Sequence, residues 1–119
     1  MAVESIDDGN GVRLIRFSGQ SATQSFSREF LPQIAKAIDA GLAHPNVRAM
    51  VLTGEGKFFS AGADIRAFAQ SIEDEEAPQL IRDLTGILHP LLVRLRHSPT
   101  ICVAALNAAC AAGVLGLAL

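Results

Sequence analysis

A turn of small residues at positions 61–63 is the stretch best suited to chemistry, because it offers main-chain N–H groups to a ligand. It follows an apolar strand predicted over Val47–Thr53 and precedes a helix predicted to begin near Ile65, for which Asp64 is a suitable N-cap. Small residues let a ligand approach the backbone closely, and the free N–H groups at a helix start favour negative charge. The pattern predicts an anion or oxyanion site made of main chain.

The same turn has an ordinary structural interpretation, because a glycine turn between a strand and a helix is common in α/β proteins. A phosphate-binding P-loop is excluded. With Gly56-Lys57 as its end, that motif would need glycine in place of Val51 and serine or threonine in place of Phe58.

Three stretches together resemble one known family. Phe59–Ile65 is similar to the signature of the crotonase superfamily, the enoyl-CoA hydratases and isomerases. Val51–Gly54 and Pro99–Asn107 also resemble strands of that superfamily, and the resemblance runs from about Val12 to Leu119. It implies an α/β, crotonase-like fold built of ββα units.

The resemblance implies an acyl-CoA substrate whose thioester oxygen accepts hydrogen bonds from two backbone N–H groups. Carried over residue by residue, the two catalytic donors are Ala63 and Gly113, and the substrate-binding residues are Ala61, Asp64 and Ile65. A glycine at position 113 also makes physical sense, because the absence of Cβ lets acyl-CoA lie against a helix start. No separate cofactor and no metal are implied, since coenzyme A is part of the substrate.

One departure from the family bears on the reaction. Hydratases of the superfamily carry a glutamate three residues after the second donor, where this sequence has Gly116. Hydration needs a positioned acid and base, which glycine cannot supply. An isomerase-like reaction, with its carboxylate beyond Leu119, is therefore favoured over a hydratase, and hydrolase, lyase and other crotonase chemistries stay open. The alternative is a non-catalytic half-domain acting in oligomer formation or partner binding.

Apolar periodicity predicts the elements that must position the turn. We expect a hairpin of Val3–Ile6 and Val12–Phe17, helices over Ser27–Ala43 and Ala77–His97, and strands over Val47–Thr53 and Thr100–Leu106 in a largely parallel sheet. Thr100–Leu106 is apolar on both faces, as in a sheet covered by helices. The apolar run at 113–119 resembles an unfinished buried helix, so we expect residues 1–119 to be the N-terminal part of a larger acyl-CoA-binding domain. The family then implies a homotrimer or hexamer.

Composition excludes other classes of function. A net charge of -2 without a basic run gives no field for nucleic acid, and the scattered histidines have no metal spacing. Cys102 and Cys110 are interpreted as small buried residues of a reducing compartment, and the acidic N-terminus lacks a signal-peptide pattern, which together predict a cytoplasmic protein. The uncharged run Thr100–Leu119 has the length of a membrane span, but Asn107 near its middle argues against insertion.

Overall fold

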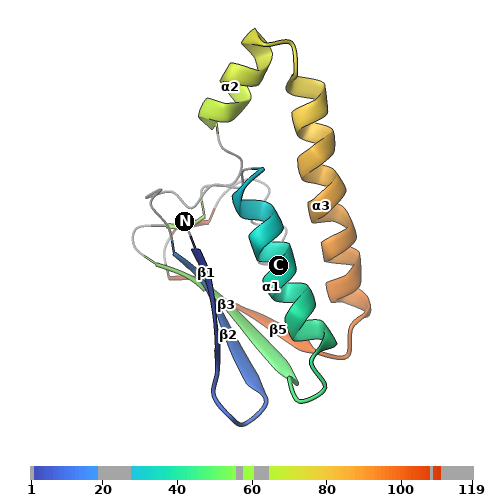
Figure 1. Ribbon diagram of the computed structural model, residues 1–119. Coiled ribbons are helices and arrows are strands. Elements are labelled where there is room, and N and C mark those ends of the chain that lie inside the picture. The colour runs from blue at the N-terminus through green and yellow to red at the C-terminus, as the bar shows by residue number, and fades with distance from the viewer. Residues whose placement is uncertain (1, 19–27, 56–57, 61–64, 108, 111–119) are drawn as a thin grey trace.

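The computed structural model describes residues 2–18, 28–55, 58–60, 65–107 and 109–110 (Figure 1). Its elements follow one another as β1 (Ala2–Asp7), β2 (Val12–Ser18), α1 (Phe30–Ala43), β3 (Ala49–Gly54), β4 (Phe58–Ser60), α2 (Ile65–Glu73), α3 (Ala77–His97), β5 (Ile101–Ala105) and β6 (Ala109–Cys110). The alternation of strands and helices confirms the predicted α/β class.

Four strands form the main sheet, in the order β1-β2-β3-β5. β1 and β2 are antiparallel, whereas β2, β3 and β5 run parallel to one another, as predicted. The hairpin turns tightly because Gly9 and Gly11 adopt φ values of 80° and 92°, which glycine tolerates. Asp8 Oδ1 stabilises the turn by accepting the N–H groups of Asn10 and Val12 at 2.7 and 3.1 Å.

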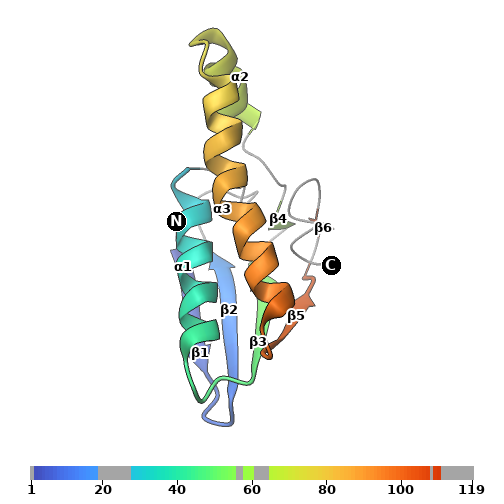
Figure 2. The same ribbon diagram turned by 90° about the vertical axis from the view of Figure 1, so that its right-hand side faces the viewer.

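Helices α1 and α3 lie side by side over one face of this sheet (Figure 2). Their apolar stripes pack against alternate residues of the strands, as the helical periodicity predicts. Phe17 of β2 meets Phe30 at the start of α1 edge to face, with ring centroids 6.0 Å apart. The largest fully buried side chains are Ile15, Phe17, Phe30, Leu31, Ile34, Ile38, Met50, Leu52 and Leu91. They form one core between the sheet and the two helices.

Helix α2 and the first part of α3 extend beyond the sheet (Figures 1 and 2). The chain reverses between them at Glu75, whose φ of 59° lies in the left-handed region. The acidic run around it is exposed. Phe68 and Ile72, which follow Ile65 at helical spacing, are 37% and 57% exposed. The apolar stripe of α2 is therefore not part of the core.

Two expectations for the last long strand are wrong. β5 is not covered on both faces: Ile101 is 64% exposed and Val103 49%. Cys102 is exposed rather than buried. The physical reason is that β5 is the edge strand of the described sheet, and the described helices cover one face only. The side chain of Cys110 lies outside the described residues.

One continuous membrane helix over Thr100–Leu119 is excluded, because Ile101–Ala105 is a strand paired with β3. Among the helices that the structure describes, none is both long and apolar enough to cross a membrane.

Candidate functional site

The carboxyl ends of β3 and β5 are joined by side-chain hydrogen bonds. Their parallel ladder ends at the pair Thr53 and Ala105, where the Thr53 hydroxyl donates to the Ala105 carbonyl oxygen at 2.9 Å. One residue further, the N–H of Gly54 donates to Asn107 Oδ1, also at 2.9 Å. The next N–H, that of Glu55, donates to the Phe17 carbonyl oxygen of β2 at 3.1 Å. The carboxyl ends of three neighbouring strands, β2, β3 and β5, are thus held together.

Beyond the carboxyl ends of β3 and β5, the chain forms two short strands that pair with each other. β4 follows β3, β6 follows β5, and the two run parallel with Phe58 opposite Ala109 and Ser60 opposite Cys110 (Figure 2). A register irregularity lies between Phe58 and Ser60. Two segments about fifty residues apart in the sequence therefore leave the sheet side by side and in the same direction.

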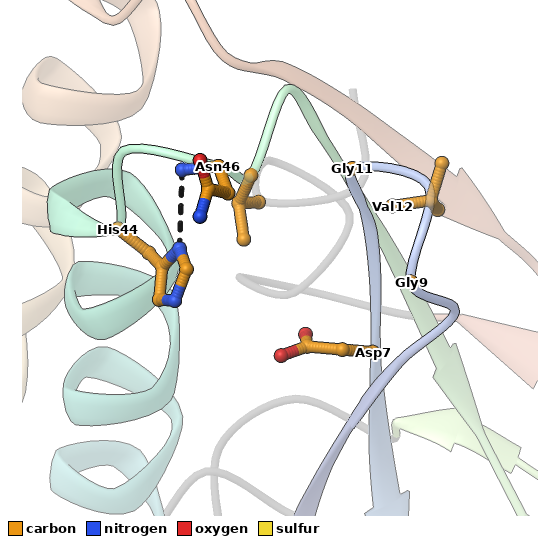
Figure 3. Close-up of a pocket in the computed structure, with 7 residues that line it drawn as sticks. Asp7, Gly9, Gly11, Val12, His44 and Asn46 are labelled. Atoms are coloured by element: carbon orange, nitrogen blue, oxygen red, sulfur yellow. Dashed lines mark hydrogen bonds between the residues drawn. The ribbon is translucent and has the colours of Figure 1, made fainter.

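A small cavity of about 220 Å³ lies at the opposite end of the sheet (Figure 3). It is lined by the hairpin turn, including Asp7 and Gly9, and by His44 and Asn46 after α1. His44 Nδ1 accepts the N–H of Asn46 at 3.2 Å, and the Asp7 carboxylate accepts two hydrogen bonds from the Arg13 guanidinium. Those bonds lower the pKa of Asp7, which stays an ionised partner of Arg13. The Asp7–Arg13 pair joins β1 to β2, and the His44–Asn46 bond stabilises the connection after α1. Both lie at the end of the sheet opposite the predicted site.

Other reactive groups offer little chemistry. Within the described ranges, no three His, Cys, Asp or Glu side chains gather closely enough to hold a metal ion. Cys102 is exposed, yet desolvation raises the pKa of its thiol, so the thiol stays protonated at neutral pH and is a weak nucleophile. The paired strands β4 and β6 remain the feature around which a site can be built.

Comparisons with known proteins identify the family of this chain. The family model described as enoyl-CoA hydratase/isomerase matches residues 7–119, which is nearly the whole chain. The chain belongs to the enoyl-CoA hydratase/isomerase family. Structurally, it superposes on a Pseudomonas aeruginosa protein with a TM-score of 0.84 at 26% identity, covering 98% of this chain and 48% of that one. An enoyl-CoA hydratase/isomerase from Xanthobacter autotrophicus gives 0.79 at 28% identity, with 97% and 42% covered. The fold is therefore the crotonase-like fold of this family.

Curated family members are similar in sequence as well. A Thermus thermophilus protein, provisionally named an enoyl-CoA hydratase, is 41% identical over 93 residues, or 78% of this chain and 36% of its own length. A Mycobacterium tuberculosis protein with the same provisional name is 35% identical over 108 residues, or 91% of this chain and 40% of its own length. The chain thus spans about 36–40% of the length of these relatives.

The residues predicted for the site mostly lie outside the described residues. This holds for Ala61, Ala63 and Asp64, which follow β4, and for Gly113, which follows β6. Ile65 is the first described residue of α2, which confirms a helix after the predicted turn. What the structure adds is the pairing of the two strands from which these segments continue.

Sequence reasoning missed two parts of this region. It predicted no strand over 58–60 or 109–110, whereas β4 and β6 pair there. The adjacent aromatics Phe58 and Phe59 were a weak strand signal. It also predicted no hydrogen bond between Asn107 and the strands. The signal that could have identified it is an asparagine directly after an apolar strand, because its short amide often hydrogen-bonds nearby main chain.

Proposed function

We propose that this chain forms the oxyanion-hole part of an acyl-CoA-processing enzyme, with the N–H groups of Ala63 and Gly113 as the two donors. The observation that carries the proposal is the pairing of β4 with β6. Ser60 and Cys110 are register partners, and neighbouring strands lie about 4.8 Å apart. Ala63 follows Ser60 by three residues, and Gly113 follows Cys110 by three residues. Three residues of extended chain span about 10 Å at most. This proximity supports convergence of the two donors on one thioester oxygen.

In the proposed mechanism the substrate is a CoA thioester whose carbonyl oxygen becomes enolate-like. Two fixed N–H donors stabilise that developing charge, and loss of one such donor typically lowers kcat by about 10²–10³. Small residues around Ala63 and at Gly113 leave room for the thioester to approach the main chain. Ala61, Asp64 and Ile65 are proposed to border the bound substrate.

The reaction we favour within the family is double-bond isomerisation rather than hydration. A 3-enoyl thioester loses a proton from C2, and a proton is returned at C4, so one carboxylate can serve both steps. Gly116 cannot act as the acid or base that hydration requires.

The names of the curated relatives favour hydration instead, so a comparison of the two reactions tests the choice. We predict that 3-hexenoyl-CoA is isomerised by the intact protein faster than crotonyl-CoA is hydrated, and that the 119-residue chain alone does not hydrate crotonyl-CoA at an enzyme-like rate.

Substitution of the second donor tests the site. In the intact protein, Gly113→Val should lower kcat for acyl-CoA turnover at least about 100-fold, because its branched side chain blocks approach to the N–H. Cys110→Ser, three residues earlier, is the control and should change kcat less than about threefold. Circular dichroism verifies folding of both. Unchanged turnover in a folded Gly113→Val variant would show that the donors are assigned to the wrong residues.

Gly116, in place of the hydratase glutamate, also motivates one alternative, a non-catalytic half-domain that acts in oligomer formation or partner binding. That role predicts a wild-type protein without turnover of any acyl-CoA. Assembly as a homotrimer or hexamer and a cytoplasmic location are further proposals. Sedimentation velocity and cell fractionation test them directly.

A further inference from the structure

We propose that Asn107 is a positioning residue, which sets the separation of the two oxyanion donors by tying the last residue of β3 to the β5–β6 connection. The inference rests on the proposed function and goes beyond it, since Asn107 itself touches no reacting atom in this scheme. Its basis is the hydrogen bond from the Gly54 N–H to Asn107 Oδ1, 2.9 Å long and partly buried.

This hydrogen bond takes over where the ladder between the strands ends. The last register pair of β3 and β5 is Thr53 with Ala105. Gly54 is buried, so its N–H needs a protein acceptor, and the one that the structure provides is the side chain of Asn107. An apolar side chain of the same size would leave a buried donor without that acceptor. The end of β3 and the β5–β6 connection would then be free to separate at this point.

The position of the bond gives it influence over the site. Asn107 lies two residues before β6, and Gly54 lies four residues before β4. The bond therefore lies just before both short strands. In these strands Ser60 is paired with Cys110, and the two donor segments follow those residues. A shift of about 1 Å in such a site can lower the rate by about 100-fold, because catalysis depends on where the donors sit relative to the charge.

The experiment compares Asn107→Leu and Asn107→Ala with Ser98→Ala in the intact protein. Ser98 is the matched control, because its hydroxyl also accepts a main-chain N–H, that of Thr100, at 3.1 Å in a partly buried setting. It lies at the opposite end of β5, away from β4 and β6. Turnover of 3-hexenoyl-CoA gives kcat and KM, and circular dichroism gives folding and Tm.

We expect both Asn107 variants to fold and to lose about 10- to 100-fold in kcat, with KM changed less than about threefold. Ser98→Ala should keep the wild-type kcat even if its Tm falls. A second readout is the infrared carbonyl band of bound butyryl-CoA, a saturated thioester that cannot isomerise. The band should shift to lower frequency on the wild-type protein and move back toward the free value on the Asn107 variants.

The outcomes separate this inference from the proposed function. If the wild-type protein neither binds nor turns over acyl-CoA, both fail. If the wild type is active and the folded Asn107 variants match it in kcat and carbonyl band, the positioning role alone fails. An equal loss of kcat in Ser98→Ala, or failure of both Asn107 variants to fold, would make Asn107 a residue of general stability and overturn the inference.

Discussion

The two faces of the main sheet differ in what covers them, although both are largely apolar. On the face toward α1 and α3, Ile15, Phe17, Met50 and Leu52 have no exposed surface. On the other face a row of apolar register partners crosses all four strands, formed by Ile6, Leu14, Val51 and Val103. The two ends of that row, Ile6 and Val103, are 46% and 49% exposed.

This difference in exposure between the two faces shows that residue type alone does not identify the core of this chain. An apolar side chain stabilises the fold in proportion to the area removed from water, at about 25 cal/mol per Å². The covered face therefore carries most of the hydrophobic stabilisation in the described residues, and the open row carries little. Substitutions on the two faces should differ accordingly in their effect on the free energy of unfolding.

The largest effect is expected for Phe17→Ala on the covered face. The variant removes a fully buried ring and its edge-to-face contact with Phe30, and leaves a cavity. Such truncations cost about 3–5 kcal/mol. Urea denaturation followed by circular dichroism measures the loss, and a cost below about 1 kcal/mol would contradict the assignment of the core.

A smaller loss is expected for Gly41→Val in α1. A Cβ at Gly41 would lie 2.3 Å from Sδ of the buried Met50, so either the Met50 side chain or the helix would have to move. Overpacking of this kind costs about 1–3 kcal/mol. Gly86→Val in α3 is the matched control, because a Cβ there meets no atom within 4 Å. Equal costs at the two glycines would mean that helix propensity, and not packing on the sheet, explains both.

Next comes the surface ion pair between the two covering helices. Arg94 of α3 donates two hydrogen bonds to the Asp39 carboxylate of α1, at 2.8 and 2.9 Å. Both side chains are more than 40% exposed, so water screens the pair. We expect Arg94→Gln to cost about 0.2–1 kcal/mol in urea denaturation, and less at 1 M salt. A loss that does not change with salt would point to packing of the arginine stem instead.

The smallest effect is expected on the open face, for Val103→Thr. The substitution keeps the shape of the side chain and adds a hydroxyl where water already reaches, so the free energy of unfolding should change by less than about 0.5 kcal/mol. The same substitution at Val47, which is 8% exposed, should cost about 1–3 kcal/mol. If Val103→Thr costs as much as Val47→Thr, the open row is covered in the protein in solution, and the contrast between the faces would be lost.

Local pattern was sufficient for most of the elements. Leucines at helical spacing predict α3 over Ala77–His97, the range that the structure has. The glycine-rich hairpin turn and the apolar runs of β2, β3 and β5 were likewise predicted within about two residues, because turn chemistry and periodicity are local properties. The family motifs placed the candidate oxyanion site on Ala63 and Gly113, and that assignment stays a prediction.

Residue exposure and the pairing of distant segments depend on tertiary structure and cannot be predicted from a local pattern. The exposure of Ile101, Val103 and Cys102 depends on β5 lying at the sheet edge and on both large helices packing on one face. The pairing of Ser60 with Cys110 and the hydrogen bond from Gly54 to Asn107 join residues about fifty positions apart. Residue patterns were enough to predict the kinds of element, the family and the candidate donors. Which residues are buried, and which distant segments meet, followed only from the packing of those elements, because burial and strand pairing are properties of neighbours in space rather than in sequence.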